Sequence, residues 1–127
     1  MAIVPNLKQA EELLREYNQE DFHIYHSQVV AGVMRYFASE YDPDRIEFWQ
    51  AVGLLHDLDF ERWPEQHCSK TKELLEARDF DPELVRAIVS HGYGICSDIE
   101  PQHMMEKILF ATDELTGLIG AVARMRP

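Results

Sequence analysis

The residue types best suited to chemistry in this chain of 127 amino acids are histidine and aspartate, spaced along its length. Six of them fall on inward rows of expected helices or at helix ends, where burying an imidazole or a carboxylate is costly unless a partner compensates it. A metal ion is the simplest such partner, because neutral imidazole nitrogen and carboxylate oxygen are both ligands of first-row metals. The six residues are His26, His56, Asp57, His67, His91 and Asp113.

The make-up of this set indicates the kind of metal site. No thiol belongs to it, which disfavours a structural zinc site and favours a catalytic site with open coordination positions. Four histidines and two aspartates are enough for two ions about 3.5–4 Å apart, the separation used by two-metal hydrolases. His56 and Asp57 are adjacent, and adjacent residues of a helix point about 100° apart. These two residues could bind the same ion only if they lie at the end of a helix. Alternatively, Asp57 bridges two ions.

About six helices are expected to position these residues, in a single all-α helical-bundle domain that spans residues 1–127. Apolar residues recur at helical spacing, and no stretch shows the alternation typical of a strand. The expected helices are residues 7–18, a second helix that Asp21 caps, and helices from Ile46 to His56, from Pro64 through Ala77, from Pro82 to His91 and from Pro101 onward. In the second helix the inward face is expected to consist of Phe22, His26, Val29, Val33 and Phe37.

Local signals mark several of the helix ends. Asn6 followed by Gln9 can form a capping box, and Asp81 before Pro82 gives a cap with a proline in the first turn. Asp42 and Pro43 break the chain before the third helix. Gly92 is a natural stop, so residues 92–101 are expected to form a loop.

The charge of the chain limits its partners. Twelve lysines and arginines stand against 23 aspartates and glutamates, a net charge of −11. Such a field repels polyanions, so duplex nucleic acid and anionic membranes are poor partners. A small anionic substrate is still compatible with it, because a bound divalent metal reverses the potential inside one cleft.

The cysteines and the chain start favour a cytoplasmic protein. Cys68 and Cys96 have no second cysteine nearby, so the expectation is two free thiols in a reducing compartment rather than a disulfide. The first residues carry no basic segment followed by an apolar one, and no apolar run is long enough to span a bilayer.

The C-terminal segment predicts an oligomer. Residues 118–123 are apolar almost all round, and a helix of that kind needs cover on every side. We expect a partner subunit to cover the segment from Leu115 to Met125, which makes the protein a homo-oligomer. The alternative is that a C-terminal part of the protein is missing from this sequence.

The order of the candidate ligands resembles a known family. The chain contains, in sequence, Tyr25-His26-Ser27, Leu54-Leu55-His56-Asp57, Glu65-Gln66-His67, Ile88-Val89-Ser90-His91 and Ala111-Thr112-Asp113. This set, over about residues 22–120, resembles the HD-domain superfamily of metal-dependent phosphohydrolases, which is named for its His-Asp pair. The chain departs from several members in following His91 with Gly92-Tyr93-Gly94.

The resemblance implies a ligand set and an activity. His26, His56, Asp57 and Asp113 match the core ligands of the family, while His67 and His91 match the histidines of members that hold a second ion bridged by the aspartate. The implied protein is an enzyme that hydrolyses a small phosphate ester or nucleotide with one or two ions of Mn, Fe, Co, Zn or Mg. The family also includes di-iron oxygenases with the same ligands, and a non-catalytic regulatory module is a third possibility.

Three further residues are candidates for catalytic roles beside Asp57. Asp59 and Glu61 follow the His-Asp pair closely enough to take a proton from a metal-activated water or to accept hydrogen bonds from the ligands. Lys70 lies three residues after His67 on the same expected helix face, where it can direct a positive charge at a substrate phosphate. Phe60, Trp63 and Tyr93 could line a pocket for a planar group.

Overall fold

The computed structural model describes the backbone of residues 2–125 and the side chains of residues 2–116. Within this part of the chain the fold is all-α, as predicted, with six α-helices and no β-strand. None of these helices is both long and apolar enough to cross a membrane. The elements are α1 (Leu7–Tyr17), α2 (Asp21–Tyr41), α3 (Ile46–Leu55), α4 (Ser69–Glu76), α5 (Pro82–Ser90) and α6 (Met104–Met125), with short 3-10 helices η1 (Pro43–Arg45) and η2 (Pro64–Gln66).

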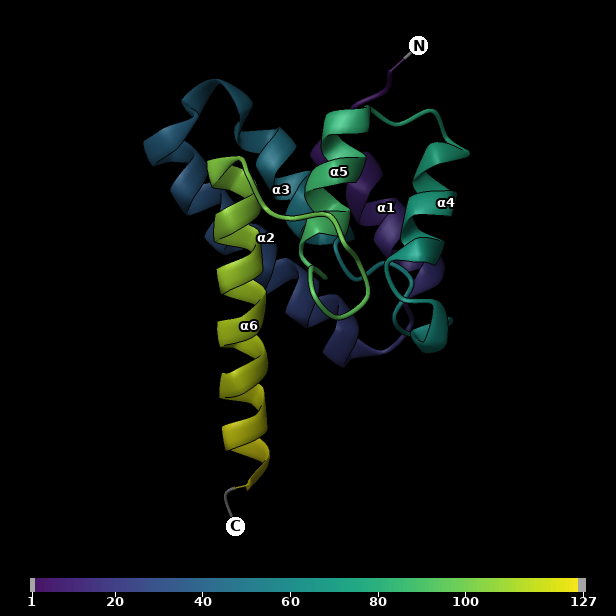
Figure 1. Cartoon of the computed structure of the whole chain (residues 1–127), viewed down its shortest axis with the longest axis vertical. Helices are drawn as coiled ribbons and strands as arrows, with labels where there is room; N and C mark the ends of the chain where they lie inside the picture. Colours follow the sequence, from purple (N-terminus) through teal and green to yellow (C-terminus); the bar gives the residue numbers. More distant parts are fainter. Residues whose placement is uncertain (1, 126–127) are drawn as a thin grey trace.

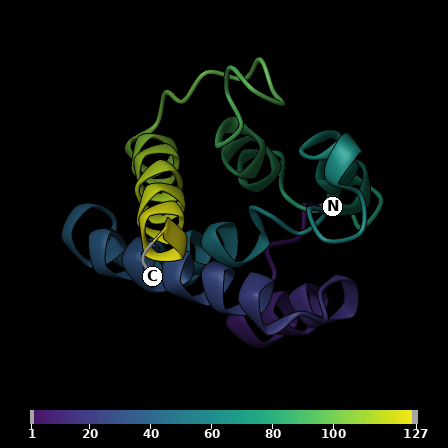
Figure 2. The same ribbon diagram turned by 90° about the horizontal axis from the view of Figure 1, so that it is seen from below.

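Helix α3 forms the centre of the fold. It packs against α1 and α2 and also contacts α5. In Figure 2, α1 and α2 lie along one side, α4, α5 and α6 stand on the other, and α3 lies between them. Most residues of α3 are buried, including Trp49, Val52 and Leu55, because neighbouring helices cover several of its sides. Its C-terminal end, where His56 and Asp57 follow, is therefore held in the middle of the molecule.

Two of the predicted helix starts are confirmed. The Asn6 side chain accepts a hydrogen bond from the Gln9 N–H at 2.8 Å, and the Gln9 side chain accepts one from the Asn6 N–H at 2.9 Å. This is the expected capping box of α1. At α5, Asp81 accepts from the Glu83 N–H at 2.7 Å, and Pro82 occupies the first helical position. These ends need only local chemistry, which explains why the sequence revealed them.

The predicted start and inward face of α2 are wrong. Glu20, rather than Asp21, is the residue before the helix, and it makes no capping hydrogen bond through its side chain. Phe22 is 57% exposed. Because α3 and α6 both pack on α2, the buried strip shifts to a row that includes small residues and allows close approach. That row is Ile24, Ser27, Val30, Ala31, Met34 and Ala38.

The single helix predicted from Pro64 through Ala77 is also wrong. The chain forms η2, then breaks, and begins α4 only at Ser69. Cys68 has a φ of 73° at the break, a value that a right-handed helix cannot contain. The break reorients the chain after η2. It allows His67 to lie beside Asp59, with 2.6 Å between His67 Nδ1 and Asp59 Oδ1.

The last helix begins at Met104 rather than at the predicted Pro101. The buried carboxylate of Glu106 accepts hydrogen bonds from the N–H groups of Gln102 and His103 and forms an ion pair with Arg86 of α5. The two local hydrogen bonds close the start of the helix, and the ion pair with Arg86 holds α6 against α5.

The second half of α6 extends beyond the other helices in Figure 1. Leu115 is exposed. The other side chains on which the homo-oligomer prediction depends, including Ile119 and Val122, lie outside the described side chains, so that prediction is untested.

The close packing of α3 on α2 gives a first prediction. A Cβ on Gly53 would lie 2.7 Å from the Ala31 Cα and 2.9 Å from its nitrogen, and backbone atoms cannot move aside cheaply. Gly53→Ala should therefore lower the free energy of unfolding by about 1–3 kcal/mol through overpacking. The matched control is Gly32→Ala on the exposed face of α2, where a Cβ meets nothing within 4 Å. That variant should gain about 0.5–1 kcal/mol from helix propensity. Urea denaturation of both variants measures the difference, and equal stabilities would contradict the packing argument.

Candidate metal centre

The first group of converging side chains comes from α2, the end of α3 and α6. The Nε2 atoms of His26 and His56 are 3.2 Å apart, and they lie 3.2 and 3.1 Å from Asp113 Oδ1. Each of these nitrogens is also 3.3 Å from Asp57 Oδ2. We call these four residues the first ligand set. It brings together side chains that are up to 87 residues apart in the sequence.

The second group lies on the other side of the same aspartate. His67 Nε2 and His91 Nε2 are 3.2 Å apart, and each is 3.3 Å from Asp57 Oδ1. His67 follows η2, and His91 follows the last residue of α5. These three residues form the second ligand set. The two oxygens of Asp57 thus face different sets of histidines, the arrangement required of a bridging carboxylate.

The spacing within both sets suits a metal ion. Four tetrahedral ligands at about 2.0 Å from an ion lie about 3.3 Å from one another. The distances of 3.1–3.3 Å within the first set match this value. His26, His56, Asp57 and Asp113 therefore form a group that could hold a metal ion. The second set offers three ligand atoms at the same spacing, which leaves further coordination positions for water or substrate.

Three of the histidines are oriented by a hydrogen bond on the far side of the ring. Nδ1 of His56 contacts the Gly53 carbonyl at 2.7 Å, and Nδ1 of His91 contacts the Ile88 carbonyl at 2.5 Å. Since a carbonyl only accepts, both Nδ1 atoms carry the proton and donate it. In the neutral ring, which is the form that binds a metal, each Nε2 then has a lone pair directed at its ligand set. The sequence feature that indicates this arrangement is a histidine directly after a helix, because its ring can reach the backbone carbonyl three residues earlier.

Asp59 orients the third of these histidines. Its Oδ1 accepts a hydrogen bond from His67 Nδ1 at 2.6 Å, and its Oδ2 accepts one from the Thr71 N–H at 2.9 Å. Asp59 is fully buried. Both oxygens are thus engaged, one by His67 and one by the backbone of Thr71, so Asp59 fixes the orientation of the His67 ring.

The other two catalytic candidates make contacts outside the ligand sets. The Glu61 carboxylate accepts hydrogen bonds from the N–H groups of Gln19 and Glu20 just before α2, which supplies by tertiary contact the cap expected of Asp21. It also lies beside Glu20 and His23 in a more exposed group. The ammonium of Lys70 packs over the Trp63 ring at 5.0 Å and lies 3.5 Å from Glu73.

Charges within the ligand sets stabilise one another strongly. Hydrogen bonds to Asp113 and Asp57 raise the pKa of His26. Burial opposes a charge on His56, but the charge of Asp57 and the hydrogen bond to Asp113 outweigh it and hold the pKa of His56 well above its ordinary value. Burial also opposes charge on the carboxylates, yet the histidines keep the pKa of Asp57 and of Asp113 low. Protons on the histidines thus provide the positive charge that a metal ion would provide when bound.

The expectation of two free thiols is wrong. Cys68 and Cys96 form a disulfide across 28 residues of sequence. The turn after His67 and the loop after His91 carry these cysteines, and the two segments meet because their histidines belong to one ligand set. The sequence holds no signal for this pairing, since it depends on the convergence of segments that are distant in the chain.

No protein-family model, no curated protein and no solved structure matches this chain. The likeness to HD-domain proteins therefore rests on the motifs and on the ligand geometry, and membership of that family is a proposal.

The charge balance at His67 gives a second prediction, for the protein stripped of metal with a chelator. Burial lowers the pKa of this imidazole, but Asp57 and Asp59 outweigh that effect and raise it from 6.5 to about 9. Because the folded pKa lies above the unfolded one, protonation of His67 stabilises the fold fully below pH 6.5. That contribution is lost as the pH rises through about 9.

Urea denaturation between pH 6 and pH 10 measures this effect as the difference in stability between the parent and His67→Gln. The difference should shrink as the pH rises. His103→Gln, which removes an exposed histidine, is the control. A difference for His67→Gln that is constant with pH would contradict the assignment.

Proposed function

We propose that this chain is a metal-dependent hydrolase of the HD-domain class that acts on a small phosphate ester or nucleotide. The observation that carries the proposal is the shared carboxylate of Asp57, with two histidine Nε2 atoms 3.3 Å from each of its oxygens. The order of the ligands along the chain, from His26 to Asp113, supports the same family. A di-iron oxygenase and a non-catalytic metal-binding module are the alternatives.

The donor atoms suit transition metals. Imidazole is a good ligand for iron, cobalt and zinc, and carboxylate oxygen favours manganese and magnesium. A set of four histidines and two aspartates fits Mn or Fe best among these, with one ion in each ligand set. The second set, with only three protein ligands, is the better position for an exchangeable water.

Exposure indicates the side from which a substrate would approach. His56 and His91 are buried at the bottom of the cluster, whereas the side chains of His26 and Asp113 are 21% and 27% exposed. Asp57, between the two sets, is also in part accessible. The exposed Phe60 ring meets the His67 ring edge to face, with centroids 5.2 Å apart. A small substrate can therefore reach the shared carboxylate from this side, with Phe60 near its path.

The residues divide the work in the proposed reaction. When bound, divalent ions would polarise a phosphate oxygen and lower the pKa of a coordinated water towards neutrality. The chain itself brings seven ligand atoms of six residues together before any ion binds, so little reorganisation is needed on metal binding. Asp59 holds the tautomer and angle of His67. The ions would also offset the negative field of the protein where the substrate phosphate binds.

Metal analysis of the purified protein tests this proposal. The parent protein should hold up to two transition-metal ions per chain. His56→Ala should abolish binding in the first set, and Asp57→Ala should abolish both, because that carboxylate serves both sets. His67→Ala and His91→Ala should each reduce the content to one ion. His103→Ala, on an exposed residue, is the control and should retain the parent content.

A panel of phosphomonoesters, phosphodiesters and nucleotides with each metal then tests the activity. Hydrolysis that disappears in Asp57→Ala but not in His103→Ala supports the proposal. Oxygen consumption by the reduced iron form, without hydrolysis, would support the oxygenase instead. Folded protein that binds no divalent metal under any supplement would overturn the proposal.

A further inference from the structure

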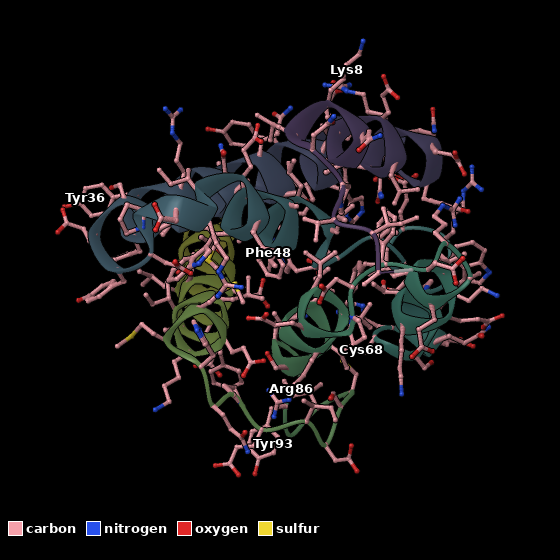
Figure 3. All side chains as sticks on the ribbon, turned by 90° about the horizontal axis from the view of Figure 1, so that it is seen from above. Lys8, Tyr36, Phe48, Cys68, Arg86 and Tyr93 are labelled. Atoms are coloured by element: carbon pink, nitrogen blue, oxygen red, sulfur yellow. A yellow bond between two sulfur atoms is a disulfide. The ribbon has the colours of Figure 1, made fainter. Side chains whose placement is uncertain are left out.

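Cys68 lies against the second ligand set. Its sulfur and a ring nitrogen from each of His67 and His91 all lie within 4.8 Å of one another. Cys68 is 2% exposed and lies between α4 and α5 in Figure 3. A thiolate and an imidazole on one zinc-like ion lie about 3.5 Å apart. A shift of about 1 Å would therefore bring this sulfur into the coordination sphere of the second set.

The backbone at Cys68 holds the sulfur in this position. The φ of 73° and ψ of −54° are unfavourable for any residue with a Cβ, and such a conformation persists only where the surrounding structure imposes it. The Cys68 carbonyl accepts the Lys72 N–H at 3.0 Å, and Asp59 fixes the neighbouring His67 and Thr71. These bonds do not involve Cys96, so reduction of the disulfide does not itself remove any of them.

The segment that carries Cys96 is likewise ordered by its own hydrogen bonds. The Gly92 carbonyl accepts the N–H groups of Ile95, Cys96 and Ser97. A side chain at Gly92 would overlap both sulfur atoms, so the sulfur pair packs directly against the backbone that follows His91. Cys96 is only partly buried, unlike Cys68. Cys96 is therefore the residue of the pair on the side from which a thiol reductant would approach, while Cys68 lies next to the histidines.

We propose that the Cys68–Cys96 pair is a redox switch on the second metal position, in which reduction supplies Cys68 as a sulfur ligand beside His67, His91 and Asp57. The inference rests on the proposed metal centre. In the disulfide form Cys68 has no thiolate to offer, and the position keeps three protein ligands. In the dithiol form it has four, which closes the position and favours soft metals such as zinc or cobalt.

The switching step balances with a dithiol reductant. A reductant thiolate attacks the accessible Cys96 sulfur, the Cys68–Cys96 bond breaks, and Cys68 leaves as the thiolate. The second thiol of the reductant then attacks the mixed disulfide, releases Cys96 as a thiol and leaves the reductant as its own disulfide. The protein gains two electrons. Cys68 either takes up a proton or, when an ion is present, binds it without one.

Cobalt loading of the oxidised and reduced protein tests the switch. The reduced form, prepared with a phosphine that is removed before loading, should show thiolate-to-Co²⁺ charge-transfer absorption in the near ultraviolet when the second equivalent binds. The disulfide form should lack that absorption. Binding of the second equivalent should be at least about tenfold tighter in the reduced form. Mutating a residue that only hydrogen-bonds to a metal ligand already changes metal affinity by about tenfold or more, and a direct ligand should matter at least as much.

Two cysteine variants are matched controls. Cys96→Ser leaves Cys68 as a free thiol that has no partner for a disulfide within the chain. It should therefore show the absorption both before and after treatment with a disulfide oxidant. Mass spectrometry of the treated sample confirms that Cys68 carries no mixed disulfide with the oxidant. Cys68→Ser should lack the absorption in every state and still bind the first equivalent. A thiol count on unfolded protein establishes the oxidation state of each sample.

The outcomes separate the two proposals. Two Co²⁺ bound with no sulfur absorption in the reduced parent or in Cys96→Ser would overturn the switch and leave the metal centre intact. The switch would also be overturned if the second position bound Co²⁺ with equal affinity in both redox forms, or if Cys68 and Cys96 never formed a disulfide. The metal centre would again be left intact. No Co²⁺ bound in either form would overturn both the switch and the proposed function.

Discussion

The carboxylate of Asp57 contacts side chains from most of the elements that build the candidate metal centre. Its two oxygens face two pairs of histidines that come from α2, the end of α3, the turn after η2 and the end of α5. The side chain of Asp57 is only 20% exposed, and a carboxylate in that position needs positive charge around it, which protonated histidines or metal ions can both provide. The geometry of the bundle is therefore tied to one side chain, because moving any of these elements away would remove a partner from this charge.

The elements that hold these ligands differ in how the fold supports them. His56 follows the central helix α3, most of which is buried, and His91 follows α5, whose inward face is apolar. The carbonyls of Gly53 and Ile88 fix both rings without the help of another side chain. His67 lies outside any helix and depends on the buried Asp59 instead. The second ligand set is thus partly built on a turn, and that same turn carries the cysteine through which we propose redox control.

Much of the architecture was predictable from local patterns. The all-α class followed from helical periodicity, and the starts of α1 and α5 followed from capping residues that act within three positions of themselves. The six histidines and aspartates stood out because polar groups on inward rows need a partner. Each of these properties depends on residues that are close in sequence, and such interactions are the same in the isolated segment as in the folded chain.

Tertiary structure alone decided the rest. The inward face of α2 and the break at Cys68 depend on α3 and Asp59, which lie elsewhere in the chain. Glu61 was predicted near the chemistry and instead closes the start of α2, and Asp59 uses both oxygens to hold His67 and Thr71. The Cys68–Cys96 pairing was unforeseeable for the same reason. Sequence determines which groups must find partners, but which group each one finds depends on the packing of helices, because a contact across tens of residues leaves no local pattern.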